Sequence, residues 1–226
     1  MDDQFFVKKI IRVEFHCHSA HSSDGLGSPR DLIDAARRKG LNRLAITDHN
    51  TIRGALEAKE KDPEFIIVGE EIRTDRGELL ALYVNEEIPP RLPYLETLNR
   101  LKNMGAFICI PHPFDNYRSS WRIEDMNALI PYIDAIEVLN ARCLLSSFNN
   151  SARVFARLHH LGQIARSDAH NPIEIGRVVT ELPDFSSAEE LRKVILLANV
   201  YGKESPFWYH LLSVYARIKK QINKEI

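Results

Sequence analysis

The feature that most constrains the fold is an alternation, along most of the chain, of short apolar runs with segments of helical periodicity. The apolar runs predict strands at Arg12–Cys17, Arg43–Thr47, Phe65–Ile72, Glu78–Val84, Phe107–Ile110, Ala135–Leu139, Gln163–Ala165 and Val178–Leu182. Strands that alternate with helices are typical of βαβ units and predict a mainly parallel sheet. The 226 residues suit a single α/β barrel.

Helix-capping residues predict where the intervening helices begin and end. Ser28-Pro29 is a typical cap and first turn, and a glycine follows several of the segments. The expected helices run from 29 to Gly40, from 52 (capped by Thr51) to 61, from 93 to 104 before Gly105, from 146 to 161 before Gly162, and from 188 to 198. No repeat or change in composition marks a linker. We therefore predict a barrel domain at residues 1–205 and a helix at 206–226.

Composition and charge narrow the class of protein. The net charge is −1 and the pI is near 6.8, so no overall basic surface for long nucleic acid is expected. Three cysteines without a C-x-x-C pair suggest a reducing compartment. The acidic start lacks a signal-peptide pattern, and no apolar run is long enough to span a membrane. We predict a cytoplasmic protein.

Potential metal ligands follow almost every predicted strand. They are His16, His18, Asp24, His49, Glu70, Glu71, His112, Glu137, Asn140, Asp168 and His170. In a parallel barrel all strands end on one face, so ligands distant in sequence would meet there. His16 and His18 are two residues apart on a strand, and their side chains therefore point to the same side. Mixed imidazole and carboxylate ligands favour Zn, Mn or Fe.

The ordered motifs H-x-H, S-D-G, T-D-H, G-x-E, P-H-P and S-D-A-H resemble those of the PHP family, named for polymerases and histidinol phosphatase. The similarity extends from about Val13 to Leu182. This resemblance implies a distorted (β/α)7 barrel with its active site at the C-terminal ends of the strands. It also implies two or three divalent metal ions and hydrolysis of phosphoesters.

The resemblance further implies three sets of metal ligands. They are His16, His18, Glu71 and Asp168 for the first ion, Glu71 and His112 for the second, and Asp24, His49 and His170 for the third. Glu71 is preferred to Glu70 because it stands two residues after Gly69, as G-x-E requires. Asn140 stands where many members have a histidine, and an amide oxygen binds Mn or Zn less well than imidazole. The second ion is therefore expected to be loosely held.

Three further residues are candidates for roles around these ligands. Asp48 is expected to orient an imidazole in support of catalysis, although a helix cap near Thr51 is the alternative. Arg142 follows Asn140 and is expected to bind a substrate phosphate with its guanidinium. Arg118 lies in the loop after Pro-His-Pro and is a second candidate for substrate binding. For both arginines a solvated surface position is the alternative.

The last predicted helix is amphipathic. Its apolar positions are Phe207, Leu211, Val214, Tyr215, Ile218 and Ile222, and its basic positions are Arg217, Lys219, Lys220 and Lys224. We expect it to pack on the barrel, with the basic residues stabilising its C-terminal dipole. A peripheral membrane contact or a protein contact through 206–226 is the alternative.

These patterns together predict a metal-dependent phosphoesterase, a phosphatase or phosphodiesterase that uses a metal-activated water. Its substrate is expected to be a nucleotide, a short oligonucleotide or another small phosphorylated molecule. Two alternatives remain open at this point. One is an amidohydrolase-type enzyme that cleaves C–N bonds, because barrels with histidine and aspartate at their strand ends also perform that chemistry. The other is a non-catalytic metal-binding interaction module.

Overall fold

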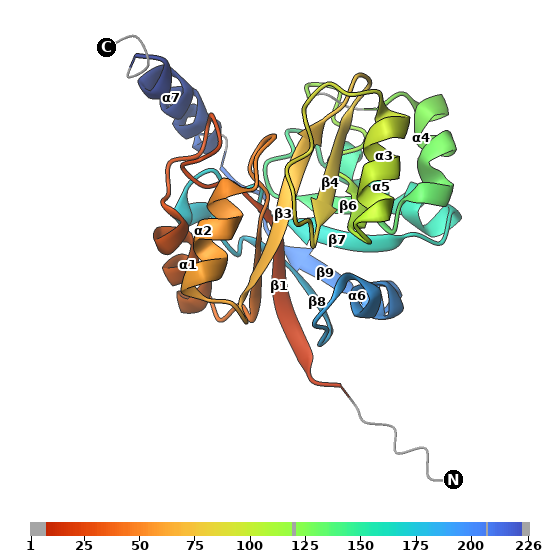
Figure 1. Ribbon diagram of the computed structural model, residues 1–226, viewed down its shortest axis with the longest axis horizontal. Helices are drawn as coiled ribbons and strands as arrows, with labels where there is room; N and C mark the ends of the chain where they lie inside the picture. Colours follow the sequence, from red (N-terminus) through yellow and green to blue (C-terminus); the bar gives the residue numbers. More distant parts are fainter. Residues whose placement is uncertain (1–7, 119–120, 207, 223–226) are drawn as a thin grey trace.

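The computed structural model describes residues 8–118, 121–206 and 208–222 (Figure 1). The strands in this part of the chain are β1 (Ile10–Cys17), β2 (Arg43–Ile46), β3 (Ile66–Arg73), β4 (Glu78–Leu82), β5 (Phe107–Ile110), β6 (Ala135–Asn140), β7 (Gly162–Arg166), β8 (Val178–Pro183) and β9 (Asn199–Gly202). The helices are α1 (Pro29–Arg38), α2 (Arg53–Lys61), α3 (Tyr94–Asn103), α4 (Ile123–Leu129), α5 (Ser146–Leu158), α6 (Ala188–Val194) and α7 (Tyr209–Ile222), with short 3-10 turns at Ile130–Tyr132, Pro172–Glu174 and Ile195–Leu197.

The sheet is a distorted and nearly closed barrel. Its strand order is β7-β6-β5-β4-β3-β2-β1-β8-β9. Beyond the end of β7, Ala169 forms a parallel bridge with Cys17 at the end of β1, which brings the two sides of the barrel together. The described strands that follow the predicted parallel arrangement are β1 to β3 and β5 to β7. The prediction is wrong for β4, which runs antiparallel to both neighbours, and for β8, which runs antiparallel to β1.

The barrel interior has an apolar lower layer and a polar upper layer. Ile67 on β3, Leu80 on β4 and Ile164 on β7 belong to one buried apolar cluster. Because alternate residues of a strand share a face, Glu71 and Arg166 point to the same side as Ile67 and Ile164. The polar side chains therefore stand directly above a packed apolar floor, in a setting with little access to water.

Helices cover the outside of the barrel on two sides. The helices α1 and α2 lie against β2, and α3, α4 and α5 cover the opposite side (Figure 1). The predicted cap of α1 is confirmed, because Ser28 accepts a hydrogen bond from the backbone of Asp31 and the reciprocal contact is present. Each side buries its own apolar cluster, so the helices fix the outer faces of the strands and leave the strand ends open.

Several local predictions differ from the structure. The helix α4 and the strand β9 have no strong periodic pattern in the sequence and were not expected. The N-cap of α2 is Ile52 and not Thr51, although the hydroxyl of Thr51 accepts a hydrogen bond of 3.3 Å from the N–H of Arg53 and donates to Glu87. Gly162 does not terminate α5, since the left-handed residue there is His160, with φ 53°, and Gly162 already belongs to β7. Gly105, with φ 70°, ends α3 as predicted.

The helix α7 packs on the barrel with the face opposite to the one expected. Its buried residues are Tyr209, Ser213 and Ala216. Its apolar stripe faces away and is 49–60% exposed at Leu211, Val214, Tyr215, Ile218 and Ile222. The predicted positions Phe207 and Lys224 lie outside the described residues. Basic side chains of α7 face the barrel, and the Nζ of Lys220 donates to the carbonyl oxygens of Ala20 and Gly25.

The contacts of α7 do not decide how the chain divides into domains, so the boundary between residues 205 and 206 stays a prediction. Within the described residues, every helix is too short or too polar to span a membrane.

Candidate metal centre

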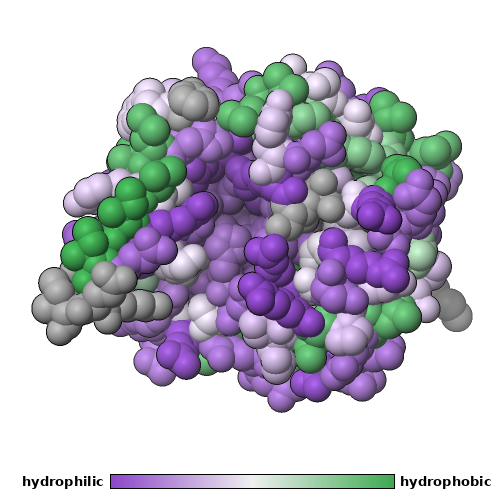
Figure 2. All heavy atoms as spheres, turned by 90° about the horizontal axis from the view of Figure 1, so that it is seen from above, coloured by the Kyte–Doolittle hydropathy of each residue, from purple (hydrophilic) through white to green (hydrophobic). Residues whose placement is uncertain are grey.

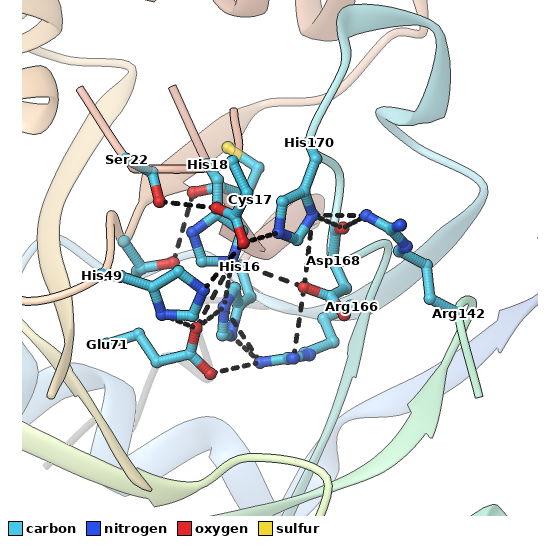
Figure 3. Close-up of polar contacts among 12 residues, drawn as sticks. His16, Cys17, His18, Ser22, His49, Glu71, Arg142, Arg166, Asp168 and His170 are labelled. Atoms are coloured by element: carbon cyan, nitrogen blue, oxygen red, sulfur yellow. Dashed lines mark hydrogen bonds and ion pairs between the residues drawn. The ribbon is translucent and has the colours of Figure 1, made fainter. Parts of the chain in front are cut away.

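The predicted ligands meet at one end of the barrel (Figure 3). They come from strand ends or from the loops that follow, and all except Asn140 contribute donor atoms to the candidate metal-binding clusters. The set that the structure brings together is His16, His18, Asp24, His49, Glu71, His112, Asp168 and His170. The side chain of His49 is 27% exposed and forms the solvent side of this group.

The first predicted ligand set has the spacing of a metal site. The Nε2 atom of His16 lies 2.9 Å from Nε2 of His18 and 3.1 Å from Oε2 of Glu71. The Nε2 atom of His18 lies 3.4 Å from Oε2 of Glu71 and 3.4 Å from Oδ1 of Asp168. Four tetrahedral ligands about 2.1 Å from one ion lie roughly 3.4 Å from one another. The four measured distances are close to this value, as expected for donors that surround one divalent ion.

The third predicted set is also assembled. The Oδ2 atom of Asp24 lies 3.4 Å from Nε2 of His170 and 3.6 Å from Nε2 of His49. His18 completes this group. The hydroxyl of Ser22 donates to the other carboxylate oxygen of Asp24 at 2.9 Å and so helps to orient it. The chemistry and spacing of these donors suit the predicted third ion, which would lie beside the first.

A third group contains a residue that the sequence analysis missed. The Nε2 atom of His112 lies 3.3 Å from Oε1 of Glu71 and 3.4 Å from Oε2 of Glu78. Glu78 begins β4, and it reaches the site because β4 reverses direction after a tight turn and pairs beside Arg73 of β3. The turn residues Asp75-Arg76-Gly77 between two apolar runs were the available signal for this hairpin.

Asn140 has a different environment from the other predicted ligands. Its side-chain oxygen accepts a hydrogen bond of 2.7 Å from the backbone N–H of Arg142. Its own backbone N–H donates to Asn149 at 3.0 Å. The amide thus supports the loop after β6, and its role as a ligand stays a prediction.

The carboxylates and histidines of the centre shift one another's pKa values. Burial opposes ionisation of Glu71, but the nearby His49, His112 and His18 outweigh it and hold its pKa below the usual value. Burial raises the pKa of Glu78, and the charge of Glu71 raises it further. Burial also opposes protonation of His49, yet the charges of Glu71 and Asp24 raise its pKa to about 10. Divalent cations would relieve the same excess of negative charge.

Two candidate ligands occupy unusual backbone conformations. The φ angles of His112 and Asp168 are 29° and 52°, in the left-handed region that non-glycine residues rarely adopt. Each lies two residues after the end of a strand, where the chain turns and the side chain points into the centre. Conformations of this kind cluster at functional sites, which agrees with the position of the donor groups.

The aspartate of the T-D-H motif binds a loop and not an imidazole. Both carboxylate oxygens of Asp48 accept hydrogen bonds from Ser19, one from its N–H and one from its hydroxyl, each 2.6 Å long. Gly54 makes room for this contact, since a Cβ there would lie 2.2 Å from Oδ2 of Asp48. The hydrogen bonds fix the segment that follows His18, so Asp48 supports the ligands indirectly. Its catalytic role stays a prediction.

Asp48→Ala is expected to lower the free energy of unfolding by about 3 kcal/mol, because it leaves two buried donors of Ser19 without an acceptor. Urea denaturation of the metal-free protein measures this change. Asp34→Ala is the matched control, since Asp34 is 42% exposed and the expected change is within about 0.5 kcal/mol. Equal effects of the two substitutions would contradict the assigned role of Asp48.

A polar cavity of about 640 Å³ opens above the ligands. Figure 2 shows it as a hydrophilic hollow, with the apolar stripe of α7 along one side. The side chain of Arg118 lies at its wall, is 23% exposed and contacts Asp168 and Asp115. Arg142 also borders the cavity but is 3% exposed. Its guanidinium contacts Nδ1 of His170 at 2.6 Å and Oγ of Ser213 at 2.8 Å, so it joins the centre to α7.

The fold and the centre define a class of protein: an α/β barrel with candidate metal-binding His, Asp and Glu clusters at its strand ends. Residues 14–88 match the PHP domain family, and residues 146–200 match the PHP-associated family. An uncharacterised protein of Methanocaldococcus jannaschii is 34% identical over 58% of this chain and 82% of its own length. The chain therefore belongs to the PHP domain family, whose relatives include metal-dependent phosphoesterases.

Two other comparisons bear on this family. A 5'-3' exoribonuclease of Haemophilus influenzae is 42% identical over 42% of this chain, which corresponds to 37% of that protein. A solved two-domain protein of Bacteroides vulgatus, described as containing a predicted PHP-like metal-dependent phosphoesterase, superposes with a TM-score of 0.74. It is 23% identical, and the match covers 88% of this chain and 66% of that one. This likeness supports the same barrel fold.

Proposed function

We propose that this protein hydrolyses phosphoesters of small molecules in a reaction that depends on divalent metal ions. The observation that carries the proposal is the convergence of His16, His18, Glu71 and Asp168, with donor contacts of 2.9–3.4 Å, below a polar cavity. Membership of the PHP domain family supports the same chemistry. The proposed metals are Mn, Zn or Fe, in agreement with mixed imidazole and carboxylate donors.

The chain's own residues would bind the ions and orient the substrate. Bound divalent cations would neutralise phosphate charge and lower the pKa of a coordinated water. Asp24, His49 and His170 would hold the predicted third ion beside the first set of ligands. Arg118 stands between the ligands and the cavity, where its guanidinium can turn from Asp168 to a phosphate. Arg142 would act by holding His170, because its Nη1 atom contacts His170 and Ser213 and its Nη2 atom donates to the carbonyl oxygen of Tyr209.

The size of the cavity favours a small substrate. A volume of about 640 Å³ suits a nucleotide, another small phosphorylated molecule or the end of a short oligonucleotide. The net charge of −1 provides no general attraction for long nucleic acid. The similarity to a 5'-3' exoribonuclease supports including short oligonucleotides among the substrates to be tested.

The proposal is tested by following phosphate release, or cleavage of a dinucleotide, over a panel of nucleotides, sugar phosphates and short oligonucleotides. Each reaction is run with Mn²⁺ or Zn²⁺ and again with EDTA. We expect turnover of at least one class of substrate with metal, and its loss with EDTA. Activity that persists fully after EDTA treatment and dialysis would contradict a metal-dependent mechanism. Protein that binds metal but cleaves none of the panel would favour a non-catalytic role.

A further inference from the structure

An arginine that no sequence motif singled out lies in the middle of the candidate metal centre. Arg166 is the last residue of β7, and its side chain is 0% exposed. It shares the inner face of the strand with Ile164 below it and precedes Asp168 by two residues. A guanidinium remains charged in proteins, so a permanent positive charge is buried here.

The guanidinium contacts donor atoms that a metal ion would otherwise use. Its Nη1 atom lies 3.0 Å from Nε2 of His16 and 3.7 Å from Oε1 of Glu71. Its Nη2 atom lies 3.4 Å from Oδ1 of Asp168 (Figure 3). Its Nε atom forms an ion pair with Glu137 on β6. One side chain thus faces three carboxylates within the barrel.

The two oxygens of Glu71 face different neighbours, and this difference identifies the ion that Arg166 affects. The Oε2 atom belongs to the first ligand set, with His16 and His18. The Oε1 atom faces His112, which is the side of the predicted second ion, and this is the oxygen that Arg166 approaches. The guanidinium therefore lies on the side of Glu71 that would bind the second ion.

The second-ion position is also the one with the weakest set of donors. His112, Glu71 and Glu78 form it, while the oxygen of Asn140 is engaged by the backbone of Arg142. The first set has two imidazoles and two carboxylates with contacts of 2.9–3.4 Å among them, and the guanidinium also contacts two of its donors, Nε2 of His16 and Oδ1 of Asp168. A fixed cation next to Glu71 would repel a divalent ion at either position, and the second position, which has fewer donors, would lose its ion first.

We propose that Arg166 is a built-in cation that takes the electrostatic place of the second ion, so that the centre binds two divalent ions and not three. The proposal rests on the proposed metal-dependent function. A role as a substitute for an ion and a role in positioning the ligands predict opposite changes in metal binding when Arg166 is removed. If Arg166 only held the ligands in place, its loss would weaken metal binding. If it stands in for an ion, its loss allows a further ion to bind.

The test is the number of Mn²⁺ ions bound per chain, measured by equilibrium dialysis and elemental analysis of the folded protein. We expect two ions for the natural chain and three for Arg166→Gln. Arg118→Gln is the matched control, because it removes another cation from Asp168 but does not touch Oε1 of Glu71. This control is expected to retain two ions. Circular dichroism verifies that each variant is folded.

Arg166→Gln leaves Glu137 buried without its partner, so that variant could fail to fold. The double variant Arg166→Met/Glu137→Gln removes both charges together and is expected to bind three ions as well. Three ions in the natural chain, or no more ions in the folded Arg166 variants than in the natural chain, would overturn the proposal for Arg166. A natural chain that binds no Mn²⁺ or Zn²⁺ would instead overturn the metal-dependent function on which it rests.

Discussion

Glu71→Gln is expected to lower phosphoester hydrolysis by about 10³-fold and to release bound metal, because Glu71 contacts more candidate ligands than its neighbours on β3 do. Its two oxygens face His16, His18, His49 and His112. A neutral amide removes the negative charge that Glu71 contributes to the first ligand set. A loss of about 4 kcal/mol in transition-state stabilisation corresponds to this factor. Initial rates and metal content measure the two effects.

Glu70→Gln provides a matched control one residue away. Glu70 is also buried, but it lies on the other side of β3, where Oε2 accepts a hydrogen bond of 3.1 Å from the N–H of Ile88. Burial raises its pKa to about 8, so it is mostly protonated at neutral pH and glutamine resembles its neutral form. We expect nearly unchanged rates and metal content. Similar losses in both variants would show that Glu71 acts through the fold and not through metal.

Gly25→Ala is expected to destabilise the protein by about 3 kcal/mol or more and to weaken metal binding at Asp24. A Cβ at position 25 would lie 2.0 Å from the carbonyl oxygen of Ser19 and 2.7 Å from its carbonyl carbon. These are backbone atoms and cannot turn away as a flexible side chain would. The loop would have to move, and Asp24 with it. Denaturant unfolding and Mn²⁺ affinity measure the two consequences.

The control for this substitution is Gly105→Ala. Gly105 has open space around the position of a Cβ, but its φ of 70° is unfavourable for alanine. The expected cost is about 1 kcal/mol, with no change in metal affinity. If Gly25→Ala costs no more than Gly105→Ala, the close approach of the two backbone segments is not what requires a glycine in the S-D-G motif.

The sequence predicted which side chains lie together better than it predicted the path of the chain. His16 and His18, two residues apart on a strand, could be assigned to one side because strand geometry requires it. The closeness of distant strand ends followed from the barrel as a whole. Sequence periodicity does not show strand direction, however. The reversal of β4 and the arrival of Glu78 at the centre therefore went unnoticed.

Two other differences have physical reasons that a pattern of polar and apolar residues does not contain. Arg166 is the last residue of the short strand β7 and looks in the sequence like an ordinary polar residue at a strand end. Strand alternation nevertheless places its side chain inside the barrel with that of Ile164. The amphipathicity of α7 indicated a buried apolar stripe. In the structure its basic face packs on the barrel instead, where Lys220 donates to the carbonyl oxygen of Gly25 and Arg217 donates to the carboxylate of Asp24.

The antiparallel hairpin of β3 and β4 has a consequence for how such a barrel can be redesigned. Its turn, residues 74–77, is closed by mutual hydrogen bonds of Thr74 and Gly77, and Gly77 lies against the ring of Trp121. The ladder from Arg73 and Glu78 downward fixes Glu71 independently of the turn. Exchanging the turn for a longer loop would therefore add a new wall beside the substrate while both glutamates keep their register. Specificity could be engineered there as a replaceable module.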